Sequence, residues 1–199
     1  MPADVFSNIL LKGVRSGQIP ARTQDARDWF RNRARDSRSA DAYPKNILAD
    51  TPNTNKVSDV SPGKMYHFFY DPKTKLTLPY YDRFPLIFMV GPADRGFYGL
   101  NLHYLPPQLR ARLMDSLYDI TNNKRYDSST KLRLSYETLK SASKFKFYKP
   151  TFKHYLSAHV RSKFIEINST EWDIALMLPT ERFEKARKSR VFADSRKMI

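Results

Sequence analysis

The residues best suited to chemistry in this sequence form a basic, aromatic-rich window from Thr138 to Ile165. Its 28 residues include no aspartate or glutamate. Lysine and arginine release counterions from phosphates, and aromatic rings can stack on exposed bases. Half of an alternating strand faces the core, so we interpret most of the aromatic residues as packing residues and the cations as phosphate contacts. The cations are Lys140, Lys144, Lys146, Lys149, Lys153, Arg161 and Lys163.

Two further groups of arginines could contribute to the same site. Arg110 and Arg112 lie on a predicted helix, away from its apolar stripe, and we include them in the predicted DNA-binding surface. The other group belongs to a predicted N-terminal helix, where aspartates oppose it, so a solvated face is as good an interpretation as a binding face. That group is Arg27, Arg31, Arg33, Arg35 and Arg38.

The sequence shows no constellation typical of an enzyme. His154 and His159 are five residues apart, a poor spacing for one metal ion on a helix. Asp71, Asp82 and Asp94 fall in predicted turns, where aspartate serves local hydrogen bonding. There is no glycine-rich phosphate loop and no Gly-x-Ser-x-Gly motif. We therefore predict no enzymatic activity, no catalytic residue, no metal site and no cofactor.

Charge and composition favour an anionic partner. The 199-residue chain has 35 Lys and Arg against 20 Asp and Glu, a net charge of +15. Residues 131–199 supply 16 basic and 7 acidic groups, a net of +9. Such an excess predicts nucleic acid first, and a membrane surface or acidic protein next. No apolar run is long enough for a transmembrane helix, the N-terminus does not resemble a secretory signal, and the lack of cysteine fits an intracellular setting.

The patterns of strands and helices that would position these cations predict an α+β fold. We expect a small, strongly bent antiparallel sheet, similar to an SH3-like barrel, with helices packed around it. Five strand-like segments carry aromatic, apolar or alternating patterns: 64–70, 86–90, 97–103, 145–148 and 163–167. Helical periodicity or capping signals mark 107–120, 131–141, 152–161 and 170–178.

The chain divides into three predicted parts. Residues 1–61 form a helical arm and linker, because short amphipathic patterns are followed by a stretch rich in Ser, Asp, Asn, Thr and Pro. Residues 62–183 form the α+β core domain. Residues 184–199 form a basic C-terminal tail that we expect to be frayed.

Two stretches of the core resemble a known family. "KMYHFFYDPKTKLTLPYYDRFPLIFMV", followed by "GFYGLNLHYLPPQLRARLMDSL", and later "FIEINSTEWDIALMLPTERF", are similar to the DNA end protector proteins of T4-type tailed bacteriophages. The resemblance covers roughly residues 62–183. It implies a minor virion protein that is carried with packaged DNA. Such a protein caps the double-stranded genome ends and blocks host exonuclease in the host cytoplasm after injection.

Other classes of protein also fit a basic, cysteine-free chain. One is a structural virion protein of the neck, portal or baseplate, whose basic face meets acidic neighbours or the DNA channel. Another is an inhibitor that binds the host nuclease itself. Salt-sensitive binding to duplex ends separates the first interpretation, a DNA end binder, from these two.

Overall fold

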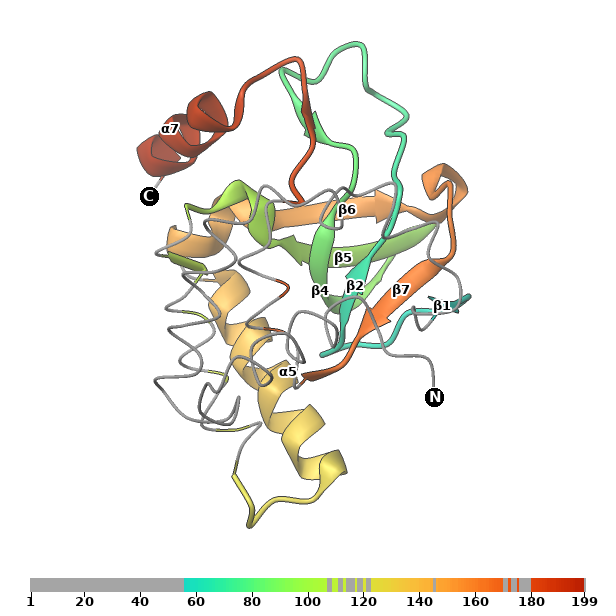
Figure 1. Ribbon diagram of the computed structural model, residues 1–199, viewed down its shortest axis with the longest axis vertical. Helices are drawn as coiled ribbons and strands as arrows, with labels where there is room; N and C mark the ends of the chain where they lie inside the picture. Colours follow the sequence, from blue (N-terminus) through green and yellow to red (C-terminus); the bar gives the residue numbers. More distant parts are fainter. Residues whose placement is uncertain are drawn as a thin grey trace, which may run out of the picture.

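The computed structural model describes residues 56–106, 109, 110, 113, 117, 120, 123–144, 146–169, 172, 175 and 180–198. Its centre is a six-stranded antiparallel sheet with helices to one side (Figure 1). The fold is therefore α+β, as predicted. Most of the predicted N-terminal arm lies outside the described residues.

The main sheet has the strand order β1-β7-β2-β4-β5-β6. Its two edge strands, β1 and β6, do not pair with each other among the described residues, so the sheet is bent without closing into a barrel. A second, two-stranded sheet joins β3 (Tyr81–Asp82) to β8 (Phe183–Glu184). The strands of the main sheet are β1 (Lys56–Val57), β2 (Met65–His67), β4 (Leu86–Ala93), β5 (Gly96–Asn101), β6 (Phe152–Leu156) and β7 (Phe164–Ile167).

The centre of the sheet follows from the apolar run of β4. Leu86–Val90 is apolar on both faces, and all five residues are buried between neighbouring strands. A register shift between Met89 and Gly91 marks a β-bulge, which bends the strand. The turn into β5 needs a left-handed residue, and Arg95 adopts it with φ 52° beside Gly96.

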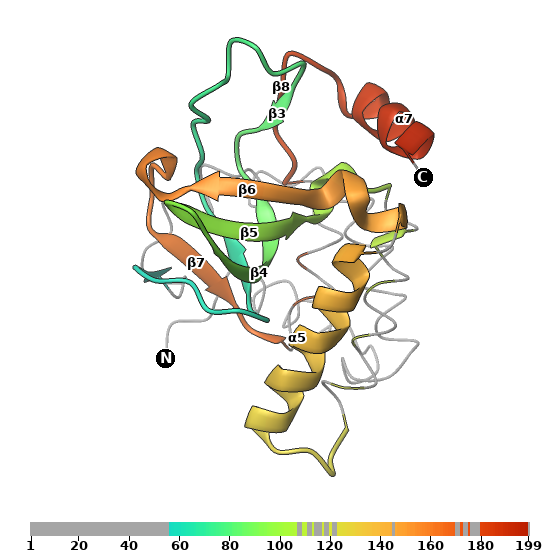
Figure 2. The same ribbon diagram turned by 180° about the vertical axis from the view of Figure 1, so that it is seen from behind.

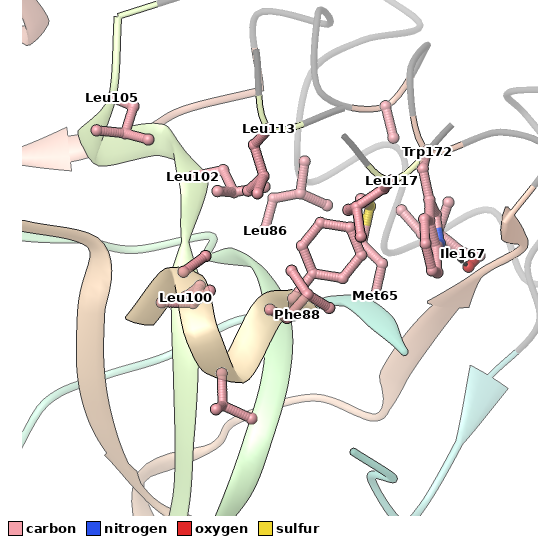
Figure 3. Close-up of a cluster of buried hydrophobic side chains, with 14 of the residues drawn as sticks. Met65, Leu86, Phe88, Leu100, Leu102, Leu105, Leu113, Leu117, Ile167 and Trp172 are labelled. Atoms are coloured by element: carbon pink, nitrogen blue, oxygen red, sulfur yellow. Dashed lines mark hydrogen bonds between the residues drawn. The ribbon is translucent and has the colours of Figure 1, made fainter. Parts of the chain in front are cut away.

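One face of the sheet carries an aliphatic core under the helices (Figure 3). Phe88 and Trp172 meet edge-to-face with ring centroids 4.7 Å apart, and the Trp172 indole N–H donates to the Ile167 carbonyl at 2.9 Å. Leu113 and Leu117 enter this core from helical positions, as the predicted apolar stripe required. The core therefore packs two helical segments against the sheet: the one with Leu113 and Leu117, which follows β5, and the one with Trp172, which follows β7.

The other face carries an aromatic core that shows how strongly the sheet bends. The ring of Phe68 lies 5.0 Å from Phe164 of β7 and 5.4 Å from Tyr155 of β6. These two strands stand far apart in the strand order, so only a curled sheet brings their side chains to one ring. Edge-to-face pairs of this kind add to simple burial.

Five helical elements flank the sheets among the described residues. α5 (Ser128–Lys144) and α7 (Lys188–Met198) are α-helices; η2 (Leu102–Tyr104), η3 (Lys146–Thr151) and η4 (Ser157–His159) are short 3₁₀ turns. Positions 109, 110, 113, 117 and 120 are also helical, as are Trp172 and Ala175. No helix of the described residues is long and apolar enough to cross a membrane.

The structure corrects three local predictions. Residues 145–148 are not a strand: α5 ends at Lys144 and the η3 turn begins at Lys146. Residues 152–161 are not a helix, because Phe152–Leu156 pairs with β5 as strand β6 and only Ser157–His159 is helical. The expected frayed tail instead forms α7, which packs against η2 and η3.

Candidate nucleic-acid interface

The end of α5 and the adjoining η3 turn carry four lysines that we call the lysine ridge: Lys140, Lys144, Lys146 and Lys149. Lys140 and Lys144 are four residues apart on an α-helix and therefore share one face. Lys146 and Lys149 are three apart on a 3₁₀ turn, where side chains at that spacing eclipse. All four side chains are exposed. Local geometry thus sorts the predicted lysines into two aligned pairs.

None of the four ridge lysines makes an ion pair with another described residue. Many other surface cations do. Lys64 pairs with Glu166 at 2.9 Å, and Lys75 pairs with Asp71 at the same distance. Like charges four residues apart on a helix repel by a few tenths of a kcal/mol. A ridge whose lysines repel one another and make no ion pair with described residues is suited to an anionic ligand.

Two other predicted cations lie at the opposite end of β6. Arg161 and Lys163 are exposed and follow the η4 turn, whereas the ridge precedes β6 (Figure 1). A five-residue strand is roughly 16 Å long. The acid-free window of the sequence is therefore divided into two basic groups by the strand between them.

Lys153, which lies between the two groups, is not an exposed cation. Its ammonium group stands over the ring of Tyr104, 4.1 Å from the centroid. Burial lowers the pKa of Lys153 to about 8. A lysine held against an aromatic face in this way serves packing and cation–π stabilisation more directly than phosphate binding.

Arg110 corrects the prediction that it contributes to the surface. Its side chain is buried, and its guanidinium donates to the Leu105 carbonyl at 2.8 Å and to the His103 carbonyl at 3.2 Å. It also lies 3.9 Å from the Glu181 carboxylate and over the ring of Phe192. Arg110 therefore fastens the C-terminal segment to the core. Arg112 lies outside the described residues.

The sequence prediction missed α7 as a basic element beside the ridge. The helix packs against η3, and both lie on the same side of the sheet in Figures 1 and 2. Arg190 and Lys197 share Asp194, at 3.7 and 3.8 Å, while Arg196 has no ion pair within the described residues. The signal that could have revealed this helix is the four-residue spacing of the buried Val191 and Ser195.

Asp82, His103 and Thr180 form a hydrogen-bonded chain with the order of groups found in hydrolase triads. His103 Nδ1 lies 2.7 Å from the Asp82 carboxylate, and its Nε2 lies 3.1 Å from the Thr180 hydroxyl. Asn101 also donates to Asp82, at 2.9 Å. All four residues are at most 3% exposed, so no substrate can reach the hydroxyl. The chain of bonds is a buried structural network that ties residue 180 to the sheet.

The buried network also sets the ionisation of Asp82. Burial alone would raise the pKa of this carboxyl, but His103, Asn101 and the Phe84 N–H offset it and hold the pKa below its usual value. No group of three or more potential metal ligands occurs within the described residues. The described part of the chain thus offers a cation-rich surface, and its one triad-like network is buried.

These features define a basic α+β protein whose surface carries lysines that make no ion pair with described residues. The sequence family described as phage T4 terminal DNA protecting protein matches residues 14–197, nearly the whole chain, and the protein belongs to this family. It is a bacteriophage protein that protects DNA ends, which confirms the resemblance noted in the sequence. No curated protein and no solved structure gave a significant match.

Proposed function

We propose that the protein protects DNA ends by binding the phosphates of the terminal duplex with the lysine ridge, without catalysis. The observation that carries this proposal is the set of four exposed lysines without ion pairs to described residues, on adjoining turns of a DNA-protecting protein. Phosphate contacts give affinity that is independent of sequence, as the cap of a genome end requires. The proposal also places the protein in the virion and then in the host cytoplasm.

The ridge should act by occupying backbone that an exonuclease must contact. An exonuclease that starts from a free end needs the terminal phosphates, and a ligand that covers them removes its starting point. If the DNA runs along β6, Arg161 and Lys163 extend the contact beyond that strand. Arg196 of α7 extends it on the other side of the lysine ridge. We leave Lys153 and Arg110 out of the interface because neither side chain is exposed: Lys153 lies against the ring of Tyr104, and Arg110 is buried against backbone carbonyls.

The first test is the salt dependence of binding in a ridge variant. Changing Lys144, Lys146 and Lys149 together to Ala removes three phosphate contacts. We expect the slope of log K against log salt to fall by about 3 from a wild-type magnitude of roughly 4 to 5. Protection of linear duplex against a processive exonuclease should decline in parallel. Fluorescence anisotropy over a series of salt concentrations gives the slope.

A control variant with the same change of charge lies around the other end of α5. Lys124, Arg125 and Arg133 are exposed and make no ion pair with described residues. Lys124 and Arg125 precede α5, whose 17 residues place them about 25 Å from η3. Their triple change to Ala should leave the slope near that of the wild type. Equal losses in both variants would mean that net charge, and not the ridge, determines binding.

A further inference from the structure

Phosphate contacts alone cannot distinguish the end of a duplex from its middle, because phosphates repeat along the whole backbone. A protein that protects ends needs a second contact that only an end offers. At the end of a duplex, one face of the last base pair is exposed. An internal base pair has both of its faces covered by neighbouring base pairs. A flat aromatic surface beside the lysine ridge would recognise this face.

Such a surface lies on β5 and β6. Tyr98 stands directly opposite His154 in the register of the two strands, and Phe152 lies two residues before His154 on the same side. The rings of Tyr98 and Phe152 stack with centroids 5.0 Å apart and an angle of 19° between their planes. The ring centroids of Tyr98 and His154 lie 5.3 Å apart with an angle of 48° between the planes, so the flat part of the surface is the pair Tyr98 and Phe152. We call these three residues the aromatic platform.

Phe152 and His154 of the platform are exposed, whereas most of the described aromatic side chains are buried or half-buried. Phe152 is 39% exposed and is the one phenylalanine with an exposed side chain among those that the structure describes. On the same side of β5, Leu100 is fully buried, so the aliphatic core ends there and the platform continues beyond it. An exposed phenylalanine already stacked on a tyrosine presents a flat apolar surface that the fold itself leaves uncovered.

The platform is held in place and lies next to the ridge. Because a carbonyl only accepts, His154 Nε2–H donates to the Asp94 carbonyl at 3.0 Å, which fixes the histidine ring against Tyr98. Phe152 directly follows Thr151, the last residue of η3, and is three residues from Lys149. Three residues span at most about 10 Å. A base stacked on Phe152 therefore has its own phosphates within reach of the ridge.

We propose that Phe152, backed by Tyr98, stacks on the terminal base pair of duplex DNA and gives the protein its preference for ends. This inference rests on the proposed phosphate binding by the ridge and assigns the end selectivity to a separate contact. The lysines supply affinity for any duplex, and the platform adds affinity only at an end. Stacking of one base on an aromatic side chain corresponds to roughly 5- to 100-fold in affinity.

The test uses a linear duplex with 2-aminopurine at the terminal or a central position, and a closed circle of the same sequence. Wild-type protein should quench the terminal reporter and leave the central one unchanged. Phe152→Leu keeps the apolar volume but removes the ring, so it should lose the quenching and lose roughly 5- to 100-fold in affinity for the linear duplex. Its affinity for the circle should stay that of the wild type. Phe152→Trp should restore both signals.

Tyr126→Ala is the matched control, since Tyr126 is 38% exposed and precedes α5, away from the platform. It should behave as wild type. Undiminished end preference and quenching in Phe152→Leu would overturn the platform while leaving the ridge intact. A wild-type protein that binds neither linear nor circular duplex would instead overturn the proposed function. Thermal unfolding of each variant verifies that the exposed substitutions leave the fold unchanged.

Discussion

His67 is a buried histidine with only one of its ring nitrogens satisfied. Its Nδ1–H donates to the Pro85 carbonyl at 3.1 Å, while Nε2 has no hydrogen-bond partner within the described structure. Burial and the neighbouring His103, whose ring lies 6.5 Å away, lower the pKa of His67 to about 4, against smaller opposing effects of the Pro85 hydrogen bond and of Asp82. The folded protein therefore holds this imidazole neutral.

This pKa predicts a loss of stability in mild acid. Unfolded His67 takes up a proton near the ordinary histidine pKa of 6.5, whereas the folded residue does so only near 4. The unfolded state thus binds more protons between these values, and the free energy of unfolding falls as pH decreases from 6.5 to 4. The loss from this residue is on the order of 3 kcal/mol. Urea unfolding at a series of pH values across this window measures it.

Two histidine variants separate this effect from general acid sensitivity. His67→Leu removes the titrating group and should flatten the stability profile between pH 6.5 and 4. His154→Gln, at an exposed histidine, should keep the wild-type profile. Asp82 contributes a separate loss at lower pH, because its pKa is already below the usual value of 3.8. A wild-type profile that is flat across the whole window would contradict the prediction.

At the scale of the elements, the strength of the local pattern decided which ones could be predicted. Leu86–Val90 is a continuous apolar run bounded by prolines and a glycine, and it forms the central strand. Alternation in "KFKFY" resembled a strand, yet Lys149 follows directly, and the three-residue spacing of Lys146 and Lys149 fits a 3₁₀ turn equally well. Five residues of β6 are too few for periodicity to separate strand from helix. The segment is a strand because it pairs with β5, whose residues lie far from it in the sequence.

The pairing of β5 with β6 depends on a glycine that allows the strands to approach. A Cβ atom added at Gly96 would overlap the Tyr155 carbonyl oxygen, an atom of the neighbouring backbone that has no room to move. Gly96→Ala should therefore lower the free energy of unfolding by at least about 3 kcal/mol. Chemical denaturation followed by circular dichroism measures the change.

Gly91→Ala is the comparison, because Gly91 lies in β4 with no atom within 4 Å of an added Cβ. Its stability should stay within about 1 kcal/mol of the wild type. Similar losses in both variants would contradict the role of the contact between strands, because the entropy of the unfolded chain alone makes a Gly→Ala change stabilising.

In the candidate site, too, features set by neighbouring residues could be predicted, whereas contacts between residues far apart in the chain could not. The residue types of the ridge could be predicted because lysines without nearby acidic residues are visible in sequence. The fate of Arg110 could not, because its partners include Glu181, which lies 71 positions later in the chain. Most aromatic residues of the acid-free window were expected to pack in the core, and nothing in the sequence sets Phe152 apart from them. The pairing of β6 with β5 places Phe152 diagonally beside Tyr98, where the two rings stack.

At the scale of the whole molecule, we propose that the N-terminal arm is separable from the core. The predicted boundary at residue 61 needs one adjustment, because Lys56–Val57 pairs with β7 and belongs to the sheet. Limited trypsin digestion should therefore cut after Arg38 or Lys45, in the polar linker, before it cuts after Lys56 or Lys64. Mass spectrometry of the stable fragment identifies the first cut. An arm that resists cleavage at both sites would be integral to the fold.

The position of β7 in the sheet has a consequence for synthesis on the ribosome. β7 lies between β1 and β2, although β2 ends at His67 and β7 begins only at Phe164, 97 residues later. At roughly 5–20 residues per second, β1 waits on the order of 5–20 s for the strand it pairs with. Until β7 has been made, one edge of β2 has no partner strand. An unpaired strand edge can pair wrongly with another chain unless a chaperone binds it. The sheet is complete only after about five-sixths of the 199 residues have been made. Truncated products that stop before Phe164 should therefore be substrates for the host's proteases and incapable of protecting a DNA end.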